Sequence, residues 1–419
     1  MPVYSAFLVS ILRTESGTVL ETKKVPLVAT HPWIDFQLDL RRLQNDPEFW
    51  MLMGEAKSKC EHINSTPIHP DTARSIYSVY LSKGAAATTA IEGNTLSEDN
   101  VRSLIEGRLQ LPQSREYLAH EVENIVQMYN EITSEVAAGR LTPLSPERIK
   151  AFNRQVLNSL EVEDWIAPGE FTSRQVGVPG YRGAPPSDCP MLIGKLCDWI
   201  NGPDLRSDDI ALQFPLALVR AIVAHLYVAW IHPFGDGNGR TARLVEFQLL
   251  LETGLVSAAA AHLMSNYYNQ TRNRYYTELQ KSSAAVDGEL SFVTYALGGF
   301  VEGLREQLDY LKEQEIRVTW RDFVHDSFKD RGGERAERLK HLVLDIEAPT
   351  KRSDAGRVSP RVAAHFGRLS AKALQRDLRQ VEEMGLVVRD GTLVRPNLEL
   401  LTHLTPPRVV RQEHDPRLQ

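Results

Sequence analysis

The part of the sequence that most restricts the fold is a long apolar run, Ala211–Ile231, which only Gln213, Arg220 and His225 interrupt with longer polar side chains. The run approaches the length of a membrane-spanning helix. Pro215 and the three polar residues favour instead a helix buried at the centre of a helical domain. We therefore predict a mainly α-helical body built around this helix, with no membrane span.

A glycine-rich loop follows the run, within the segment His232–Arg243 (HPFGDGNGRTAR). Pro233 ends the preceding helix because its ring cannot continue the backbone hydrogen-bond pattern. A second amphipathic helix is predicted over Thr241–Thr253, with Gly254 as its C-cap. Glycines at alternate positions let the backbone take positive φ and turn its N–H groups toward one point: Gly235, Gly237 and Gly239.

Chemically, this loop combines the features of an anion site with a proton acceptor. Free N–H groups and the dipole at a helix N-terminus both favour phosphate. Arg240 and Arg243 lie three positions apart on the first turn, so both guanidinium groups can reach the same anion. The imidazole of His232 is mostly neutral at pH 7 and can accept a proton. The segment therefore indicates a site that holds a polyphosphate and moves a proton beside it.

This segment resembles the signature of Fic-domain proteins, HxFx(D/E)GN(G/K)RxxR, and matches it at every defined position. The resemblance implies the Fic fold, a helical bundle with a β-hairpin flap. It also implies the transfer of AMP from ATP to a Ser, Thr or Tyr hydroxyl of a protein. A kinase-like activity is less expected, because Gly239 stands where phosphate-transferring relatives have Lys.

On this resemblance, His232 is expected to be the general base that takes the proton of the hydroxyl. Asp236 is expected to bind the Mg²⁺ (or Mn²⁺) that bridges the phosphates, and Phe234 to anchor the loop in the core. Arg243 is expected to bind the γ-phosphate. These roles fit a reaction that depends mainly on positioning and charge stabilisation. The residues expected to bind the α- and β-phosphates are Gly235, Gly237, Asn238, Gly239 and Arg240.

A second motif lies upstream, in TTAIEGN at residues 88–94. The small residues of Gly84–Ile91 predict a tightly packed helix that ends at the following Gly-Asn pair. Glu92 at that end opposes the helix dipole, which suggests a specific cationic partner. The motif resembles the (S/T)xxxE(G/N) inhibitory helix of Fic proteins, with Thr88, Glu92 and Gly93 at the defined positions. The resemblance implies that Glu92 pairs with Arg243 and blocks productive seating of the γ-phosphate.

Between the two motifs, Pro168–Pro186 combines Gly and Pro with short β-rich runs and is predicted to form a hairpin. It resembles the Fic flap, which covers the nucleotide and lends an edge strand to the target peptide. Many relatives carry Arg directly after the aromatic residue of this segment, whereas this chain has Thr172 there. The residues expected to contact the target are Arg174, Gln175, Val176, Gly177 and Val178.

Two adjacent tyrosines, Tyr275 and Tyr276, also resemble a family feature near the adenine of ATP. The alternative is that both rings pack a helix, as buried aromatic side chains commonly do. The sequence leaves both interpretations open.

Composition places the chain among globular proteins. Its 419 residues allow two or three domains, and 42% hydrophobic and 24% charged residues are ordinary values. The three cysteines (Cys60, Cys189 and Cys197) lack metal-ligand spacing, which indicates a reducing compartment and no zinc site. No cationic segment precedes the N-terminal apolar patch, so we expect no signal peptide and a cytoplasmic protein.

Charge is unevenly distributed along the chain. Residues 331–419 contain 17 Lys and Arg against 12 Asp and Glu, a net charge of +5, so the rest of the chain carries −11 to give the total of −6. A basic C-terminal region on an acidic body is a reason to consider nucleic acid as a partner.

This C-terminal region is predicted to contain helices at 335–346, 360–366 and 370–384, and two strands around the Asp390-Gly391 turn. Three helices and a hairpin resemble a winged helix-turn-helix, whose third helix would expose Lys372, Arg376 and Arg379 to DNA. The alternative is a dimerisation or target-docking module with a solvated basic face. DNA contact is the less favoured interpretation, because the acidic residues at 377, 382 and 383 dilute the charge.

The sequence thus predicts five segments: a weakly ordered N-terminus (1–32), a helical region with the inhibitory helix (33–114), a Fic core (115–314), a linker (315–334) and a winged helix domain (335–419). The expected function is a self-inhibited protein adenylyltransferase that uses Mg-ATP, with self-modification and homodimerisation considered. One alternative is removal of AMP from a modified protein, with Glu92 positioning a water. The other is a transcriptional regulator in which the Fic core senses nucleotide.

Overall fold

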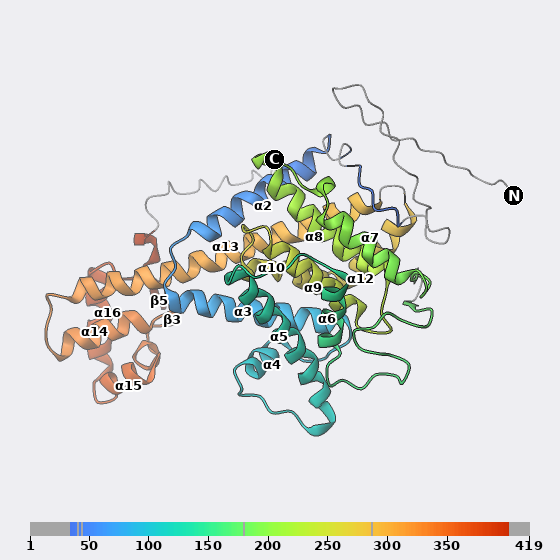
Figure 1. The fold of residues 1–419 in the computed structure, drawn as a ribbon. Helices are drawn as coiled ribbons and strands as arrows, with labels where there is room; N and C mark the ends of the chain where they lie inside the picture. The colour runs from blue at the N-terminus through green and yellow to red at the C-terminus, as the bar shows by residue number, and fades with distance from the viewer. Residues whose placement is uncertain (1–33, 40–41, 43–44, 179–180, 286–287, 402–419) are drawn as a thin grey trace, which may run out of the picture. The chain divides into compact units, whose positions relative to one another are not determined.

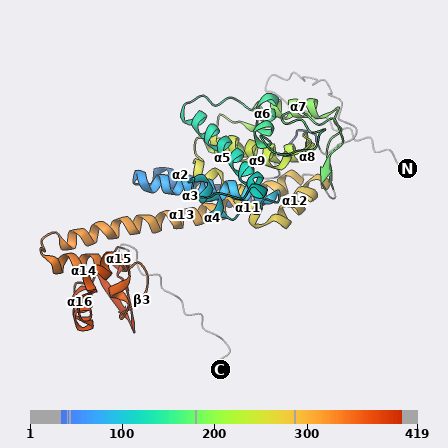
Figure 2. The same cartoon turned by 90° about the horizontal axis from the view of Figure 1, so that it is seen from below.

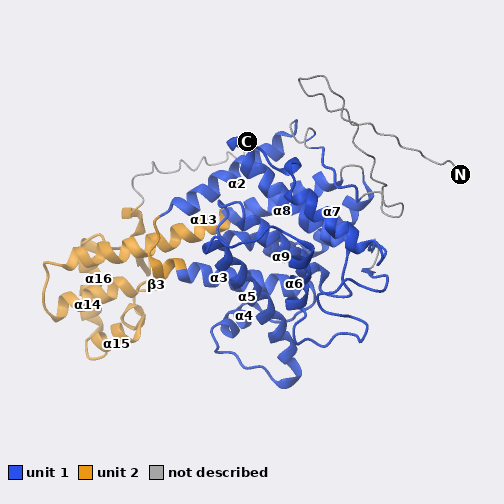
Figure 3. Cartoon of the chain, viewed as in Figure 1, with its two compact units in different colours: residues 1–66, 74–304 blue, residues 67–73, 305–419 orange. Residues whose placement is uncertain are grey.

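The computed structural model describes residues 34–39, 42, 45–178, 181–285 and 288–401 (Figure 1). The predicted segment 1–32 and the last residues of the predicted winged helix domain, 402–419, lie outside the described residues. The chain divides into two compact units, residues 1–66 with 74–304 and residues 67–73 with 305–419 (Figure 3). Each unit is considered by itself below.

Helices make up nearly all of the regular secondary structure of the first unit, which confirms the prediction of a mainly α-helical body. The strands β1 (Gly177–Val178) and β2 (Tyr181–Arg182) form the predicted hairpin. The helices that lie wholly or mainly in this unit are α2 (Pro47–Ser65), α3 (Pro70–Ile91), α4 (Glu98–Ile105), α5 (Glu116–Ala137), α6 (Pro146–Val156), α7 (Cys189–Asn201), α8 (Ile210–Ile231), α9 (Asn238–Leu251), α10 (Ala258–Ala261), α11 (Leu263–Gln270) and α12 (Arg272–Ala284), with 3-10 turns η1 (Gln113–Arg115) and η2 (Pro203–Leu205).

Helix α8 is the central helix of this unit, as its apolar sequence predicts. It is long and apolar enough to cross a membrane, yet 83% of its most apolar window is buried inside the protein. The Asp209 side chain caps its N-terminus by accepting from the Ala211 N–H at 2.9 Å. Nearly every residue of the following helix, α9, is buried as well. The loop between α8 and α9 is therefore held between two core helices.

The N-terminal helix α3 packs against the core through its small residues. A Cβ atom at Gly84 would lie 2.4 Å from Nδ1 of the buried His262, so only glycine allows this close approach. The His262 ring lies against Tyr129 and Phe247, at 4.5 Å and 4.8 Å between ring centroids. Burial lowers the pKa of His262 to about 3, so the ring is neutral. The C-terminal half of α3 is thus fixed directly on the hydrophobic core.

The second unit contains the helices and the hairpin that its sequence predicts, and adds one short strand (Figure 2). Its three strands form one antiparallel sheet in the order β3–β5–β4, with Val387 opposite Pro396 and Asp390 opposite Leu393. Its elements are α14 (Glu334–Asp345), β3 (Thr350–Lys351), η3 (Ala355–Arg357), α15 (Pro360–Phe366), α16 (Ala371–Glu383), β4 (Val387–Asp390), β5 (Leu393–Pro396) and η4 (Leu398–Leu401). Its relation to winged helix domains stays a prediction.

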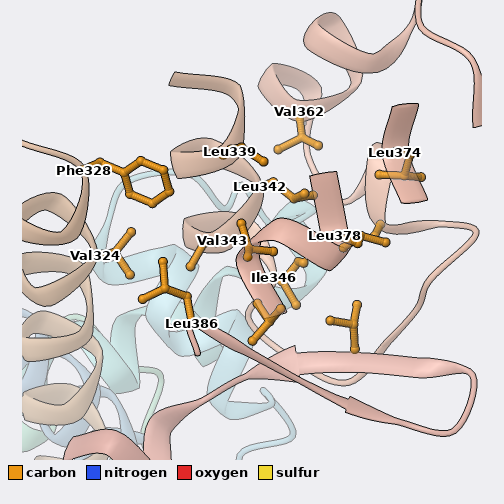
Figure 4. Packing of buried hydrophobic residues seen from close by; sticks show 14 of the residues in the cluster. Val324, Phe328, Leu339, Leu342, Val343, Ile346, Val362, Leu374, Leu378 and Leu386 are labelled. Carbon is orange, nitrogen blue, oxygen red and sulfur yellow. The ribbon is translucent and has the colours of Figure 1, made fainter. Parts of the chain in front are cut away.

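The segment 315–334 differs from the linker that the sequence predicts. Helix α13 runs from Gly288 to Phe328, and the division between the units falls within it, at residues 304 and 305. Trp320, Val324 and Phe328 recur every four residues on one face and are buried in the core of the second unit (Figure 4). The end of α13 therefore belongs to that core, and the Gly-rich break comes only at residues 331–333.

Candidate active site

The loop between α8 and α9 begins with His232 in an unusual backbone conformation. His232 has φ 52°, in the left-handed region, and its N–H donates to the Val228 carbonyl at 3.0 Å, so it forms the C-cap of α8. Helix α9 then begins at Asn238, three residues before the predicted start, because Gly237 with φ 74° serves as its N-cap. The residues Asn238 and Arg240 therefore lie on the first turn of α9.

The three loop glycines do not share the role that the sequence suggested. Of these three glycines, only Gly237 has positive φ. Gly235 is needed for space, since a Cβ atom there would lie 2.9 Å from Ile166 Cγ1. Gly239 is helical, and a Cβ atom there would lie 2.2 Å from the Glu92 Oε1 atom. The prediction of positive φ at all three positions was wrong: at Gly235 and Gly239 the constraint is a close neighbouring side chain, Ile166 and Glu92 respectively.

Two side chains hold the loop in shape. The Asn238 side chain donates to the Phe234 carbonyl at 2.8 Å and accepts from the Phe234 N–H at 2.9 Å. Phe234 is fully buried, with its ring centroid 5.6 Å from that of Phe171. Both polar atoms of the Asn238 amide are thus engaged with the loop itself. Asn238 acts by closing the loop, whereas its expected contact with phosphate stays a prediction.

The imidazole of His232 is suited to accept a proton. Its Nδ1 atom lies 3.3 Å from the Ala229 carbonyl, to which it donates when protonated, leaving the Nε2 lone pair available. Burial lowers the pKa of His232, and the Ala229 carbonyl and the charges of Glu92 and Asp236 only partly oppose this effect. The ring is therefore neutral at pH 7.

Arg243 and the end of α3 meet as the upstream motif predicts. The Arg243 side chain is 1% exposed, and its Nη2 atom donates to Glu92 Oε1 at 2.7 Å. Thr88 accepts twice, at its hydroxyl from Nε (2.5 Å) and at its carbonyl from Nη2 (2.9 Å). The pairing is not the two-nitrogen fork expected for a carboxylate, because Thr88 occupies the Nε side. Arg243 Nη1 is buried without a hydrogen-bond partner among the described residues.

Electrostatics favour the ionised pair. Burial acts to raise the pKa of the Glu92 carboxyl, but the charge and hydrogen bond of Arg243, with Arg240 and His232 behind it, hold that pKa below its usual value. Burial likewise acts to lower the pKa of Arg243, and the Glu92 charge outweighs it, so that pKa is raised. The Glu92 side chain is 31% exposed, so a ligand can reach the carboxylate side of this pair.

Arg240 lies on the same helix turn and faces two carboxylates beyond hydrogen-bond distance. Its side chain is 5% exposed, with Nη1 at 3.6 Å from Glu121 Oε1 and Nη2 at 3.6 Å from Asp236 Oδ1. Its Nε and Nη1 atoms are buried and make no hydrogen bond within the described chain. Together with Arg243, it presents buried N–H donors that an anion can satisfy.

Asp236 is the acidic residue expected to bind a divalent cation. Its side chain is 50% exposed, and Oδ1 accepts from the Gly237 N–H at 2.5 Å. No group of three or more His, Cys, Asp or Glu that could hold a metal by itself occurs among the described residues. This arrangement fits Mg²⁺, which is usually bound by one or two carboxylates together with the phosphates of a substrate.

The flap is attached to the backbone on both sides of His232. From β2, the Tyr181 hydroxyl donates to the Trp230 carbonyl at 2.6 Å, and just after this strand the Ala184 N–H donates to the Ile231 carbonyl at 3.0 Å. On its first side, the Thr172 N–H donates to the Pro233 carbonyl at 2.9 Å. These contacts fix the hairpin relative to the imidazole.

Among the five expected target-binding residues of the flap, the Val176 carbonyl accepts from the Gly183 N–H at 3.1 Å within the hairpin, and the other four divide into two groups. The guanidinium of Arg174 stacks over the Trp165 ring at 5.1 Å, and the Gln175 amide donates to the Gly183 carbonyl at 2.6 Å, so both stabilise the flap. Gly177 and Val178 form the exposed strand β1, with Val178 46% exposed. The exposed edge of β1 is the part available to another chain.

The two tyrosines differ in position. Tyr275 is buried, and its hydroxyl lies 2.9 Å from Nε2 of His225, within a cluster of aromatic rings. Tyr276 is 41% exposed, and its hydroxyl donates to the Ile91 carbonyl, at the end of α3, at 3.2 Å. The packing alternative therefore describes Tyr275, and only Tyr276 is open to a ligand.

Sequence reasoning missed two polar residues that support the loop. Asn153, on α6, donates to the Asp236 carbonyl at 2.8 Å and accepts from the Gly169 N–H at 2.9 Å, which joins the loop to the base of the flap. Glu121, on α5, faces Arg240. Neither stands in a motif, and the only signal is a polar side chain on the buried side of an amphipathic helix.

Comparison with known proteins matches residues 143–250 to the Fic/DOC family. Over 167 residues the chain is 28% identical to protein adenylyltransferase fic-1 of Caenorhabditis briggsae. The aligned residues cover 40% of this chain and 31% of that protein. Over 193 residues it is 30% identical to protein adenylyltransferase Fic of Aedes aegypti, covering 46% and 35% respectively. The chain thus spans about a third of the length of these curated relatives.

Solved structures show the same fold. A Fic family protein from Desulfovibrio desulfuricans G20 has a TM-score of 0.50 at 19% identity, covering 84% of this chain and 96% of that chain. A fragment of Fic-1 from Caenorhabditis elegans has a TM-score of 0.50 at 20% identity, covering 66% and 75% respectively. The family match contains the whole loop and nearly all of α9, so the segment that holds the candidate site is similar to the Fic/DOC family.

Proposed function

We propose that this chain is a protein adenylyltransferase, which transfers AMP from Mg-ATP to a hydroxyl of a target protein. The observation that carries the proposal is the pair of buried guanidinium groups, Arg240 and Arg243, with unpaired N–H donors beside the neutral imidazole of His232. Such donors fit a polyphosphate, and such an imidazole fits a general base. The names of the matched relatives support the same activity.

The reaction uses the groups around the loop as follows. The target hydroxyl oxygen attacks the α-phosphorus of ATP, the bond to the β-phosphate oxygen breaks, and pyrophosphate leaves. His232 accepts the hydroxyl proton at Nε2, since Nδ1 donates to the Ala229 carbonyl. Arg240 and Arg243 bind and orient the phosphates by charge-assisted hydrogen bonds. Asp236 would hold Mg²⁺, which neutralises negative charge on the phosphates.

We propose further that the enzyme inhibits itself through Glu92. The carboxylate occupies Arg243 Nη2, the group expected to bind the γ-phosphate, so ATP cannot seat fully while the pair persists. The exposed edge of β1 is the proposed binding place for an extended segment of the target, which would add as a further strand. A segment of a second copy of this chain could bind in the same way and become modified.

The experiment that tests the function is incubation of purified wild-type and Glu92→Gly protein with ATP labelled at the α-phosphate, followed by intact mass. We expect label and a mass increase of one AMP on the protein or on added target. Label from γ-labelled ATP alone would overturn the proposal in favour of phosphate transfer. Loss of AMP from a previously modified protein, with no transfer in either variant, would assign removal of AMP instead.

A second candidate function is contact between duplex DNA and α16. Lys372, Arg376 and Arg379 are exposed on this helix. The acidic residues that argued against DNA are largely engaged: Asp377 is 0% exposed and paired with two arginines of α14, and the Glu382 carboxylate pairs with Arg352. Glu383 stays exposed and pairs with Arg379, so Lys372 and Arg376 carry the positive charge of the outer face of α16 that fits the phosphate backbone of a duplex.

Titration of the full chain against a DNA duplex at several salt concentrations tests this candidate. We expect salt-dependent affinity, and Arg376→Ala should weaken it and reduce the slope against salt by about one ion. Arg317→Ala, which removes an exposed arginine of α13, is the matched control and should leave both unchanged. If the wild type showed no salt-dependent affinity for the duplex, the exposed face of α16 would be assigned to a protein partner instead.

A further inference from the structure

A single asparagine attaches the turn after Glu92 to helix α5. Asn94 is 7% exposed, and its Nδ2 group donates to the Leu118 carbonyl at 2.9 Å and to Glu121 Oε2 at 2.8 Å. Its Oδ1 atom accepts from the Leu96 N–H at 3.0 Å. All hydrogen-bonding groups of this amide are therefore used, and they fix the backbone two residues beyond the inhibitory carboxylate.

The other oxygen of Glu121 faces the phosphate-binding side of the loop. Glu121 Oε1 lies 3.6 Å from Arg240 Nη1, too far for a hydrogen bond but close enough for strong Coulomb attraction. Arg240 is 5% exposed and Glu121 20%, so water screens this attraction only weakly. One carboxylate thus contacts the inhibitory turn with one oxygen and attracts a phosphate-binding arginine with the other.

We propose that Glu121 is a positioning residue that, with Asn94, forms a second attachment of the inhibitory turn to the loop, separate from the pair of Glu92 and Arg243. The proposal rests on the proposed function, in which Glu92 opposes the seating of ATP. The first attachment occupies Arg243 directly. The second attachment holds the turn so that Glu92 stays within reach of Arg243. The Glu121 carboxylate also competes with phosphate for Arg240.

The two halves of this attachment predict different kinetic effects. Asn94→Ala removes the hydrogen bonds that fix the turn, so Glu92 leaves Arg243 more easily and kcat for AMP transfer should rise roughly two- to tenfold, the factor that one hydrogen bond commonly contributes. In the Glu92→Gly background the same change should leave kcat unaltered, because the carboxylate that the turn positions is gone. The matched control is Thr95→Ala, which alters the exposed neighbouring residue.

Glu121→Gln keeps an acceptor for Asn94 but removes the charge beside Arg240. It should lower the KM for ATP roughly twofold or more in both backgrounds with little change in kcat, since Arg240 then attracts phosphate without competition. A purely structural role of Glu121 would instead lower stability and leave the ratio of KM to kcat unchanged. Thermal unfolding of each variant separates these outcomes, and Asn94→Ser replaces Asn94→Ala if the latter does not fold.

Amide hydrogen exchange of residues 88–96 gives a readout that needs no activity. Asn94→Ala should speed exchange in this segment, whereas Thr95→Ala should not. If Glu92→Gly transfers AMP but Asn94→Ala neither raises kcat nor speeds exchange, the second attachment is wrong. If no variant transfers AMP while exchange responds as expected, the attachment stands and the proposed function is wrong.

Discussion

Each of the two units contains a charged side chain that is almost completely buried, Arg243 in the first and Asp377 in the second, and the two charges are neutralised in different ways. In the first unit, Arg243 is 1% exposed and meets one carboxylate, Glu92, which is 31% exposed and 151 residues away in the chain. In the second unit, Asp377 is 0% exposed and meets two arginines of the nearby α14. Arg335 donates to one of its oxygens at 3.1 Å, and Arg338 to the other at 2.7 Å.

The difference lies in what remains unsatisfied. Both oxygens of Asp377 are engaged by cations from a neighbouring helix, so no further ligand is needed. Arg243 keeps a buried nitrogen without a partner among the described residues, and its carboxylate can be reached from solvent. A ligand anion can therefore replace Glu92. The comparison teaches that a fully satisfied buried charge fixes structure, whereas a partly satisfied one suits a site that exchanges partners.

The largest effect expected from this comparison concerns His232, which belongs to the same site as the pair of Glu92 and Arg243. In the Glu92→Gly background, His232→Ala should lower kcat by about 10²–10⁴, because the general base is lost. The affinity for ATP should be retained, since the imidazole does not bind phosphate in the proposed mechanism. Initial rates and equilibrium binding of ATP measure the two effects, with the exposed His120→Ala as control. A near wild-type kcat would contradict the role of His232.

A smaller effect is expected from the exchange of partners at Arg243. Glu92→Gly should raise transfer by about 10- to 100-fold, the factor for losing a competing hydrogen bond to a charged group. Arg243→Ala in that background should abolish the gain, because the freed arginine binds the γ-phosphate. The rates of AMP transfer by the wild type, Glu92→Gly, Arg243→Ala and the double variant test this expectation. Glu347→Gly, the same substitution in an exposed segment of the second unit, should change nothing.

The free energy of unfolding, measured with and without Mg-ATP, should distinguish Asp377 from the pair of Glu92 and Arg243. Asp377→Ala should destabilise the second unit by about 2 kcal/mol, the order for hydrogen bonds to a charged group, and Mg-ATP should not restore it. Glu92→Gly should destabilise the first unit without nucleotide and gain more from Mg-ATP than the wild type, since phosphate then satisfies Arg243. Calorimetry with and without nucleotide measures both, with the exposed Asp322→Ala as control. If Mg-ATP stabilised Glu92→Gly and Asp377→Ala equally, the proposed difference between the two buried charges would be wrong.

The smallest effect expected is on pH dependence. Burial lowers the pKa of His232 below its usual value near 6.5, and the neutral ring is the proton acceptor. Transfer by Glu92→Gly should therefore be constant from about pH 7 to 8 and fall only as the pH drops below about 6.5. Glu92 raises this pKa in the wild type, so the wild-type acid limb should lie at higher pH. An acid limb above pH 7 in Glu92→Gly would contradict the assignment.

Local sequence signals predicted much of this structure. The hairpin turns at Gly391 and Thr392, one residue beyond the predicted Asp390-Gly391 turn, and the Ser370 side chain caps α16 by accepting from the Ala373 N–H at 3.3 Å. These features depend on a few adjacent residues. The meeting of Glu92 and Arg243 followed from a family resemblance, since nothing in the local sequence relates residues so far apart.

What the sequence did not reveal are contacts between polar residues distant in the chain. The bond between Asn94 and Glu121 spans 27 residues; Asn94 ends the TTAIEGN segment, but Glu121 belongs to no motif, and no pattern relates the two residues. Asp377 was counted as exposed negative charge because its partners lie on another helix. The end of α13 was assigned to a linker because its apolar residues are sparse, and their burial depends on α14 and α16 packing against them. The hydrophobic pattern of the sequence alone does not identify which distant residues will be in contact.

The helical Gly239 ties the proposed inhibited state to the absence of a side chain. A methyl group at this position would overlap the Glu92 carboxylate, which is the flexible partner and would be displaced from Arg243. A single base change in the gene converts a glycine codon to an alanine codon. Inhibition would therefore be easy to lose by mutation and hard to keep without selection. A lineage that retains both the glycine and the glutamate has, on this view, been selected for restraint of the enzyme as well as for its catalysis.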